Sequence, residues 1–322
     1  MVDGKELRDT KMNLVFAGTP RFAVPTLGRL VDAGFRVPLV ITQPDKPRGR
    51  GMEITFSPVK QAAESFNIPV IQPDKIKTND DLRAQLASLG PDAIIVVGYG
   101  RIIPQWMLDL PRFGNLNLHA SLLPKYRGAA PIQWAIALGE RVTGVTTMRI
   151  NAGLDTGDIL LQREMTIAPD DTSETLAPRL SAIGADLMVE TLHGLSAGTI
   201  AARPQEDSLA TLAPILKKED GAIDFRRPAG EIVNRLRGFQ PWPGAFTTFR
   251  GKALSVRSAR ASGTSGQAAP GSIESAADRL LVQCGGGASI EILELQPEGK
   301  KRMAARDFIH GYQPKSGERL GE

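Results

Sequence analysis

Short apolar runs alternate with segments of helical spacing along the first two-thirds of the chain. Residues 13–18 form an apolar run typical of a buried strand, residues 22–32 place apolar side chains close to helical spacing, and residues 37–42 form a second apolar run. A strand, a helix and a second strand in this order favour a parallel, doubly wound sheet. The fully apolar run 93–97 is typical of a central strand of such a sheet.

The same pattern predicts further elements up to residue 195. We expect helices at 58–66, 80–89, 105–110, 130–138 and 171–195, and strands at 68–71, 115–119, 143–150 and 159–167. Asp171 and Glu174 have the spacing of a capping box for the last helix. The last two strands are expected to pair antiparallel through an acidic turn.

The pattern changes in the last third of the chain. Residues 197–220 are irregular and rich in small residues, which is typical of a linker. A helix is expected after it at 229–237, followed by strands near 247–250, 252–260, 271–275, 280–284 and 289–296. Several short strands at close spacing indicate a small β-barrel, which we expect to be OB-like.

These elements predict an α/β fold with two domains. We expect a Rossmann-like domain with a doubly wound, mostly parallel sheet over residues 12–196, a linker over 197–220 and the C-terminal barrel over 221–322. Residues 1–11 are polar and are expected to form a disordered extension.

The composition fits a soluble protein of the reducing cytoplasm. The chain has 322 residues, of which 42% are hydrophobic and 23% charged, and it has no apolar run near the ~20 residues of a membrane helix. It begins without a secretory signal. Cys284 is the only cysteine, so no internal disulfide is possible, and the three scattered histidines give no metal-ligand spacing. We expect no membrane, no metal and a monomer.

The net charge of +4 is unevenly distributed. Residues 1–208 hold 22 Lys and Arg against 23 Asp and Glu, whereas residues 209–322 hold 17 against 12. A neutral first part and a basic second part suggest chemistry in one and an anionic partner on the other. The alternative is a soluble surface with a modest basic excess.

The candidate chemistry lies at the end of the strand expected at 115–119. Asn117 and His119 are two residues apart, so both side chains point to the same face of the sheet. Open α/β sheets carry their active sites at the carboxyl ends of the strands. Asp155 lies in the acidic turn 153–158, which could bring its carboxylate to the imidazole.

These three side chains suit attack by a neutral nucleophile on an acyl carbonyl. Asn117 would donate a hydrogen bond to the developing oxyanion. His119 would donate as well, or take the proton that leaves the nucleophile. Asp155 would orient the imidazole and stabilise its protonated form. The alternatives are a satisfied core histidine and an aspartate that caps its own turn.

A basic loop follows the second expected strand. Residues 43–58 carry Lys46, Arg48 and Arg50 among glycines and prolines, and the loop is longer than most connections of its kind. It is interpreted as an arm that grips phosphate, with a solvated surface loop as the alternative. The turn after the first strand lacks the Gly-x-Gly-x-x-Gly fingerprint, which weakens the hypothesis of a nicotinamide-dependent oxidoreductase.

Seven segments together closely resemble the methionyl-tRNA formyltransferase family over about residues 12–312. They are residues 16–20, 43–47, 117–119, 121–124, 126–133, 153–158 and 241–246. The resemblance implies that the donor is 10-formyltetrahydrofolate and that the acceptor is the α-amino group of methionine on the initiator tRNA. The amine would attack the formyl carbon directly through a tetrahedral intermediate.

The resemblance also implies roles for individual residues. Asn117, His119 and Asp155 match the family's catalytic residues. The folate-contacting segment corresponds to Ser121, Leu122, Leu123 and Pro124, and the wall of the pterin pocket to Arg101, Ile102 and Ile103. The basic loop matches the insertion that enters the acceptor end of the tRNA, with Arg50 at the position of its key arginine. The C-terminal domain matches the part that holds the acceptor arm.

The chain departs from the family pattern within the basic loop. Met52 and Glu53 stand where relatives often carry two lysines, and Arg48 adds a cation just upstream. Two alternative functions remain. One is a formyltransferase that acts on a small amine, such as a sugar amine, and the other is a tRNA-binding protein with an inactive site.

Overall fold

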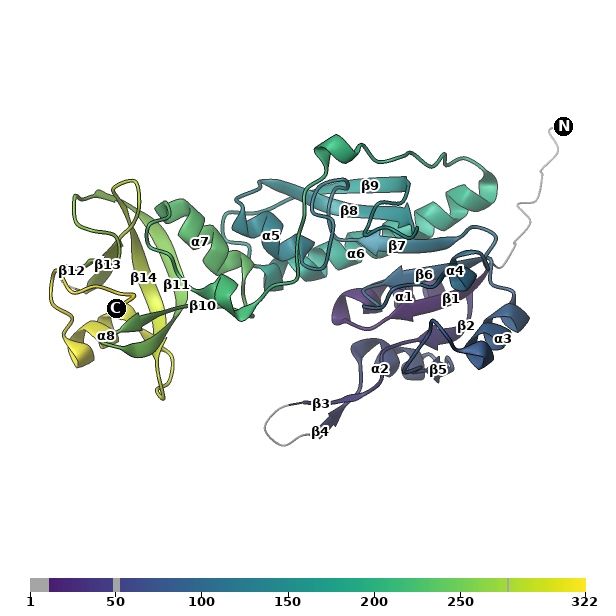
Figure 1. The fold of residues 1–322 in the computed structure, drawn as a ribbon, viewed down its shortest axis with the longest axis horizontal. Helices are drawn as coiled ribbons and strands as arrows, with labels where there is room; N and C mark the ends of the chain where they lie inside the picture. Colours follow the sequence, from purple (N-terminus) through teal and green to yellow (C-terminus); the bar gives the residue numbers. More distant parts are fainter. Residues whose placement is uncertain (1–11, 49–52, 277) are drawn as a thin grey trace. The chain divides into compact units, whose positions relative to one another are not determined.

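The computed structural model describes residues 12–48, 53–276 and 278–322 (Figure 1). Its first part is a seven-stranded sheet in the order β5-β2-β1-β6-β7-β8-β9. The strands are β1 (Asn13–Gly18), β2 (Arg36–Ile41), β5 (Val70–Ile71), β6 (Ala93–Val97), β7 (Asn115–His119), β8 (Val142–Arg149) and β9 (Ile159–Thr166). The pairs from β5 to β7 are parallel, and β8 is antiparallel to β7. The predicted mostly parallel, doubly wound sheet is therefore confirmed.

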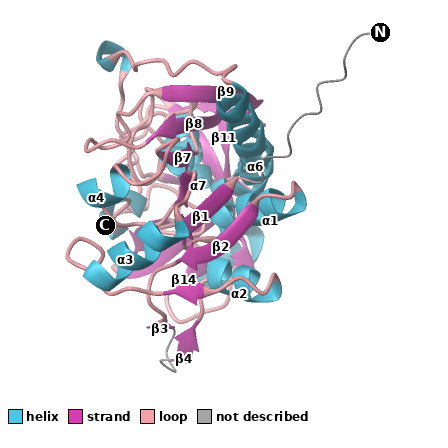
Figure 2. Ribbon diagram, turned by 90° about the vertical axis from the view of Figure 1, so that its right-hand side faces the viewer, coloured by secondary structure: helices cyan, strands magenta, loops and turns pink. Residues whose placement is uncertain are grey.

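Helices cover both faces of this sheet. In Figure 2, α1 (Val24–Asp32) and α2 (Pro58–Ser65) lie on one face, and α3 (Asp80–Leu89) and α4 (Gln105–Leu108) lie on the other. Strand β6 is buried along its whole length, since it is central and covered on both faces. The strand order reverses between β1 and β6, so the loops after β1, β6 and β7 leave the same edge of the sheet.

The ends of two helices follow from local chemistry. Ser57 caps α2, because its hydroxyl accepts a 3.0 Å hydrogen bond from the backbone N–H of Lys60. Asn79 caps α3 in the same way through the N–H of Leu82, at 2.9 Å. Helix α3 ends at Leu89 and is capped by Gly90, whose φ of +52° is a conformation that glycine adopts without strain.

The long helix α6 (Ser173–Ala197) begins with a capping box one residue later than predicted. The hydroxyl of Thr172 accepts from the N–H of Thr175, and the hydroxyl of Thr175 accepts from the N–H of Thr172. Asp171 instead accepts from the backbone N–H of Ala168, at 2.7 Å. The predicted pairing of Asp171 with Glu174 was therefore displaced by two threonines with the same spacing.

The basic segment contains a hairpin where the sequence predicted only a loop. Strand β3 (Lys46–Arg48) pairs antiparallel with β4 (Glu53–Thr55), and the hairpin projects from the end of the sheet that carries α2 (Figure 1). Arg50 lies outside the described residues, as do residues 1–11, which were expected to form an extension.

The C-terminal part is a small antiparallel barrel, as predicted. Its sheet has the order β10-β11-β14-β13-β12, and β15 pairs with β14 beyond the end of β13. Its elements are α7 (Ala229–Gly238), β10 (Ala245–Phe249), β11 (Lys252–Ser265), β12 (Ile273–Ala276), β13 (Arg279–Gln283), β14 (Ala288–Pro297), β15 (Met303–Ala304) and α8 (Ala305–Tyr312). Helix α8 was not predicted.

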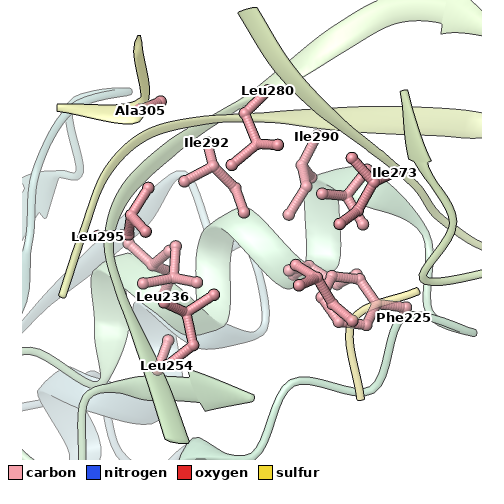
Figure 3. Packing of buried hydrophobic residues seen from close by; sticks show 14 of the residues in the cluster. Phe225, Leu236, Leu254, Ile273, Leu280, Ile290, Ile292, Leu295 and Ala305 are labelled. Atoms are coloured by element: carbon pink, nitrogen blue, oxygen red, sulfur yellow. The ribbon is translucent and has the colours of Figure 1, made fainter. Parts of the chain in front are cut away.

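The barrel is filled by aliphatic side chains. Figure 3 shows Leu254, Ile292 and Leu295 from the strands gathered around Leu236 of α7. Cys284 belongs to the same core, and burial raises the pKa of its thiol to about 11. An inert, buried thiol is consistent with a purely structural role.

The last residues of the chain join the two edges of this sheet. Leu320 bridges to Phe249 in β10, and Arg319 bridges to Ser272 just before β12. Leu320 is itself buried in the barrel core. The edge strands are thereby covered, which is one way that β-proteins avoid exposed edges.

Contacts group the chain into two compact units. The first comprises residues up to 127 together with 144–164 and 178–210, and the second comprises 128–143, 165–177 and 211–322. Helix α5 (Pro131–Ala137) belongs to the second unit and packs against α7. The continuous domain limits predicted from the sequence stay a prediction. Over the described ranges, no helix is both long and apolar enough to cross a membrane.

Candidate active site

Strand β7 carries the two polar side chains that the sequence singled out. It lies between β6 and β8, with Asn117 opposite Val96 on one side and Met148 on the other. Asn115, at the start of the same face, is buried, and its amide donates a 2.7 Å hydrogen bond to the carbonyl of Met107. Asn115 therefore anchors the strand. Asn117 is half-buried, and among the described residues its side-chain amide has no hydrogen-bond partner, so it can donate to a substrate.

His119 is held by a hydrogen bond at one ring nitrogen and lies near a carboxylate at the other. Its Nε2 lies 2.8 Å from the carbonyl oxygen of Tyr126, and the ring is only 6% exposed. A carbonyl oxygen can only accept, so Nε2 carries a proton, and in the neutral ring the lone pair is on Nδ1. The structure brings Nδ1 to 3.7 Å from Oδ2 of Asp155. The predicted approach of Asp155 to His119 is observed.

Both partners of His119 have left-handed backbone conformations. The φ angle is +63° at Tyr126 and +52° at Asp155, and neither residue is glycine. Such conformations cost roughly 1–3 kcal/mol each and persist only where the surroundings hold them. Two costly turns therefore flank one imidazole, a pattern typical of functional sites.

The turn that presents Asp155 is fixed from within and from outside. Inside it, Oδ1 of Asn151 accepts from the N–H of Gly153 at 3.0 Å and from the hydroxyl of Thr156 at 2.8 Å. Gly157 passes so close to the carbonyl of Arg149 that a Cβ would lie 1.8 Å from that oxygen. From outside, the amide of Gln205 donates to the carbonyls of Asp155 and Gly157, at 2.8 and 2.7 Å.

Arg127 holds the other end of Gln205. Its Nε and Nη2 donate to Oε1 of Gln205 at 3.0 and 2.8 Å, and Nη2 also donates to the exposed carboxylate of Asp207. Neither Arg127 nor Gln205 was predicted from the sequence to belong to the site. Arg127 lies within a family motif, but Gln205 lies in the expected linker, where nothing in the sequence pointed to it.

The segment expected to contact folate follows β7 and is bound to β8. The hydroxyl of Thr146 donates to the carbonyl of Ser121 at 2.6 Å and accepts from the N–H of Leu123 at 3.1 Å. Ser121 and Leu123 are buried, whereas Leu122 and Pro124 are half-buried. Of the four residues, Leu122 and Pro124 have the side chains more accessible to a ligand.

The segment expected to wall the pterin pocket follows β6. Arg101 donates to the carbonyl of Asp74, Ile103 is buried in the core, and Ile102 is 90% exposed. The amide of Gln43, which follows β2, donates to the carbonyl of Tyr99 at 2.8 Å. The loops after β2 and β6 are thus joined at the carboxyl edge of the sheet.

The base of the β3–β4 hairpin is anchored by a half-buried ion pair. Nζ of Lys60 lies 2.5 Å from Oδ2 of Asp45 and 4.0 Å from the centre of the Phe56 ring, so it contacts both ends of the insertion. Gln72 donates to Oδ1 of Asp45 at 2.8 Å. Three basic residues were predicted to bind tRNA. Lys46 and Arg48 are the first and last residues of β3, and Arg50 lies outside the described residues.

The arrangement provides a proton acceptor, a hydrogen-bond donor and a carboxylate. Nδ1 of His119 can take a proton beside Asp155, and the amide of Asn117 can donate to a developing oxyanion. In the ranges that the structure describes, no group of three or more His, Cys, Asp or Glu side chains is placed to hold a metal ion. These side chains support acyl transfer to a nucleophile.

Family models match both parts of the chain. The model described as formyl transferase matches residues 12–192, and the model described as formyl transferase, C-terminal domain, matches residues 215–313.

Known relatives cover nearly the whole chain. It is 66% identical over 310 residues to the methionyl-tRNA formyltransferase of Koribacter versatilis, covering 96% of this chain and 99% of the relative. The enzyme of the same name from Acidobacterium capsulatum is 60% identical, covering 96% and 100%. Among solved structures, an N-formyltransferase from Helicobacter canadensis, in complex with folinic acid and dTDP-3-aminofucose, superposes with a TM-score of 0.67 at 20% identity, covering 89% of this chain and 99% of that one.

Proposed function

The chain belongs to the methionyl-tRNA formyltransferase family, and from this premise we propose that it transfers the formyl group of 10-formyltetrahydrofolate to the α-amino group of methionyl initiator tRNA. The proposed chemistry rests on the position of His119 at the end of β7, between the carbonyl of Tyr126 and the carboxylate of Asp155. The proposed substrate rests on the 66% identity, over 96% of the chain, to a relative named methionyl-tRNA formyltransferase.

The site residues have complementary tasks in this proposal. The neutral amine attacks the formyl carbon, and the amide of Asn117 donates to the oxygen on which charge develops. Nδ1 of His119 accepts the proton that the amine loses, and Asp155 stabilises the resulting imidazolium. When the bond from the formyl carbon to the folate nitrogen breaks, that nitrogen takes the proton back, so the site is restored.

Two loops on one sheet edge are proposed to hold the folate donor. Residues 121–124 follow β7 and residues 101–103 follow β6, and these strands are parallel neighbours. The exposed side chain of Ile102 and the half-buried Leu122 and Pro124 offer apolar surface to a flat heterocycle.

The β3–β4 hairpin and the barrel are proposed to bind the tRNA. The hairpin carries Lys46 and Arg48 and leads to Arg50, and residues 209–322 carry an excess of five positive charges. Phosphate contacts of this kind weaken as salt rises. Transfer to tRNA is therefore expected to be more salt-sensitive than folate binding.

The proposal is tested by formyl transfer from 10-formyltetrahydrofolate with the purified chain. Initiator methionyl-tRNA, the same tRNA without methionine, and an amino-sugar nucleotide are offered separately. Transfer to the charged tRNA alone supports the proposal. Transfer to the amino sugar instead would assign the chain to small-amine formyltransferases, and tRNA binding with no transfer to any acceptor would indicate an inactive binding protein.

A further inference from the structure

We infer that Gln205, held by Arg127, is a positioning residue for the reaction, because its amide joins the two turns that hold His119. One turn supplies the carbonyl of Tyr126 to Nε2, and the other supplies the carboxylate of Asp155 near Nδ1. The inference rests on the proposed function and concerns a residue in the expected linker.

The first step is that Gln205 acts on the Asp155 turn through the backbone. Its amide nitrogen has two hydrogens, and they are donated to the carbonyls of Asp155 and Gly157 at 2.8 and 2.7 Å. The carbonyl of Asp155 belongs to the peptide plane that directly follows this strained residue, and the carbonyl of Gly157 lies two residues further along the same turn. The contacts therefore fix the backbone on the C-terminal side of Asp155, and the direction of the Asp155 side chain depends on that backbone.

The second step is that Arg127 orients the amide of Gln205. The guanidinium is buried and donates twice to Oε1 of Gln205, so the amide nitrogen must face the turn. Arg127 directly follows Tyr126, the other partner of His119. The path from Arg127 through Gln205 to Asp155 therefore connects the two turns independently of the imidazole.

The third step is that the place of Gln205 is set by the sheet. Two residues earlier, Arg203 pairs with Ile159 through two backbone hydrogen bonds of 2.8 Å. Ile159 begins β9, immediately after the Asp155 turn. The linker is thus fixed along the edge of the sheet, and Gln205 reaches the turn from a rigid position.

Two substitutions separate positioning from simple packing. Gln205→Met keeps the length of the side chain and removes its donor and acceptor. Gln205→Glu keeps an acceptor for Arg127 and replaces the donor with a carboxylate that faces two carbonyl oxygens. Glu206→Gln, at the exposed neighbouring position, is the matched control.

Kinetics of formyl transfer give the first measurement. We expect both Gln205 variants to lower kcat by about 10- to 100-fold, with KM for both substrates within about threefold, because a displacement of about 1 Å can cost 10²-fold in rate. In an Asp155→Asn background, Gln205→Met should change kcat by less than about threefold, because coupled residues are not additive. An unchanged kcat, or the same loss in both backgrounds, would overturn the inference.

The ring nitrogens of His119 give a second measurement that needs no turnover. In histidine-labelled protein, Gln205→Met and Gln205→Glu should shift the ¹⁵N signal of Nδ1 of His119, whereas Glu206→Gln should not. An unshifted signal would overturn the inference, even if the unaltered chain transferred no formyl group. Absence of transfer by the unaltered chain would count against the proposed function alone.

Discussion

Nε2 of His119 donates a 2.8 Å hydrogen bond to the carbonyl oxygen of Tyr126, and this contact decides which nitrogen is left for chemistry. The free position is Nδ1, 3.7 Å from Asp155. A base that accepts at Nδ1 acquires its positive charge beside a carboxylate.

The tautomer of His119 can be measured directly. We expect ¹⁵N spectra of the neutral protein to show Nε2 protonated and Nδ1 unprotonated. The chain has only three histidines, so His193→Gln and His310→Gln assign the signals. Protonation of the neutral ring at Nδ1 instead would contradict the contact with Tyr126.

Removing the charge of Asp155 should slow catalysis with little effect on folding. Asp155→Asn keeps the size of the side chain, and asparagine tolerates the left-handed conformation at φ +52°. We expect kcat to fall about 10²-fold or more, the scale of general acid–base effects. The control is Asp158→Asn, which alters a carboxylate in the same turn. Equal losses in both variants would point to the turn rather than to the Asp155 charge.

The ion pair at the base of the hairpin should matter for tRNA and not for folate. Lys60→Met removes the partner of Asp45 and the contact with Phe56, so the hairpin is held less firmly. We expect KM for methionyl-tRNA to rise several-fold, with KM for the folate donor unchanged. Lys75→Met removes an exposed charge of the same sign. If both variants weaken tRNA use equally, net charge and not hairpin anchoring is responsible.

Leu320 should be a large contributor to barrel stability. Its side chain is buried, and Leu320→Ala is expected to lower the free energy of unfolding by about 2–5 kcal/mol, as for other buried leucines. Leu209, which is 56% exposed, is the control, and its alanine variant should lie within about 0.5 kcal/mol of the unaltered chain. Denaturant unfolding measures both, and a Leu320→Ala effect as small as the control's would contradict the contribution of this buried side chain to the barrel core.

Glu291 should make the barrel less stable in acid. Hydrogen bonds from Arg279 and Arg260 hold the pKa of this carboxyl below its ordinary value of 4.5. The unfolded chain therefore binds the proton first, so the contribution of Glu291 is complete above about pH 4.5 and is lost as the pH falls through the folded-state pKa.

The thermal midpoint between pH 3 and pH 7 measures this contribution. Glu291→Gln should be less stable than the unaltered chain at pH 7 and should lose less stability on acidification. Glu274→Gln, at an exposed position, should leave the pH profile unchanged. A profile for Glu291→Gln parallel to that of the unaltered chain would show that another group is responsible.

The sequence predicted best where one physical signal dominates. Residues 80–89 and 93–97 match α3 and β6 at both ends, because a capping asparagine, a terminal glycine and a fully apolar run mark them. Asn117 and His119 were identifiable from their two-residue spacing on β7. The hairpin was missed because its strands have three residues each and carry proline and charges, so they show no alternation.

Other features depend on contacts that sequence periodicity does not encode. Gln205 reaches the Asp155 turn because Arg203 pairs with β9, a pairing between residues that are 44 positions apart. The carbonyl of Tyr126 is a backbone group, so its residue type carries no signal for the contact with His119. The order of the strands in the sheet likewise follows from long-range pairing.

The bridges made by Arg319 and Leu320 also have a consequence for the order of events during folding. They join residues that are far apart in the sequence, because Leu320 lies 71 positions from Phe249 and Arg319 lies 47 positions from Ser272. Such contacts cost more loop-closure entropy than the pairing of neighbouring strands, so they are expected to form after the local hairpins. The two edges therefore stay uncovered until β10 has paired with β11 and β12 has paired with β13.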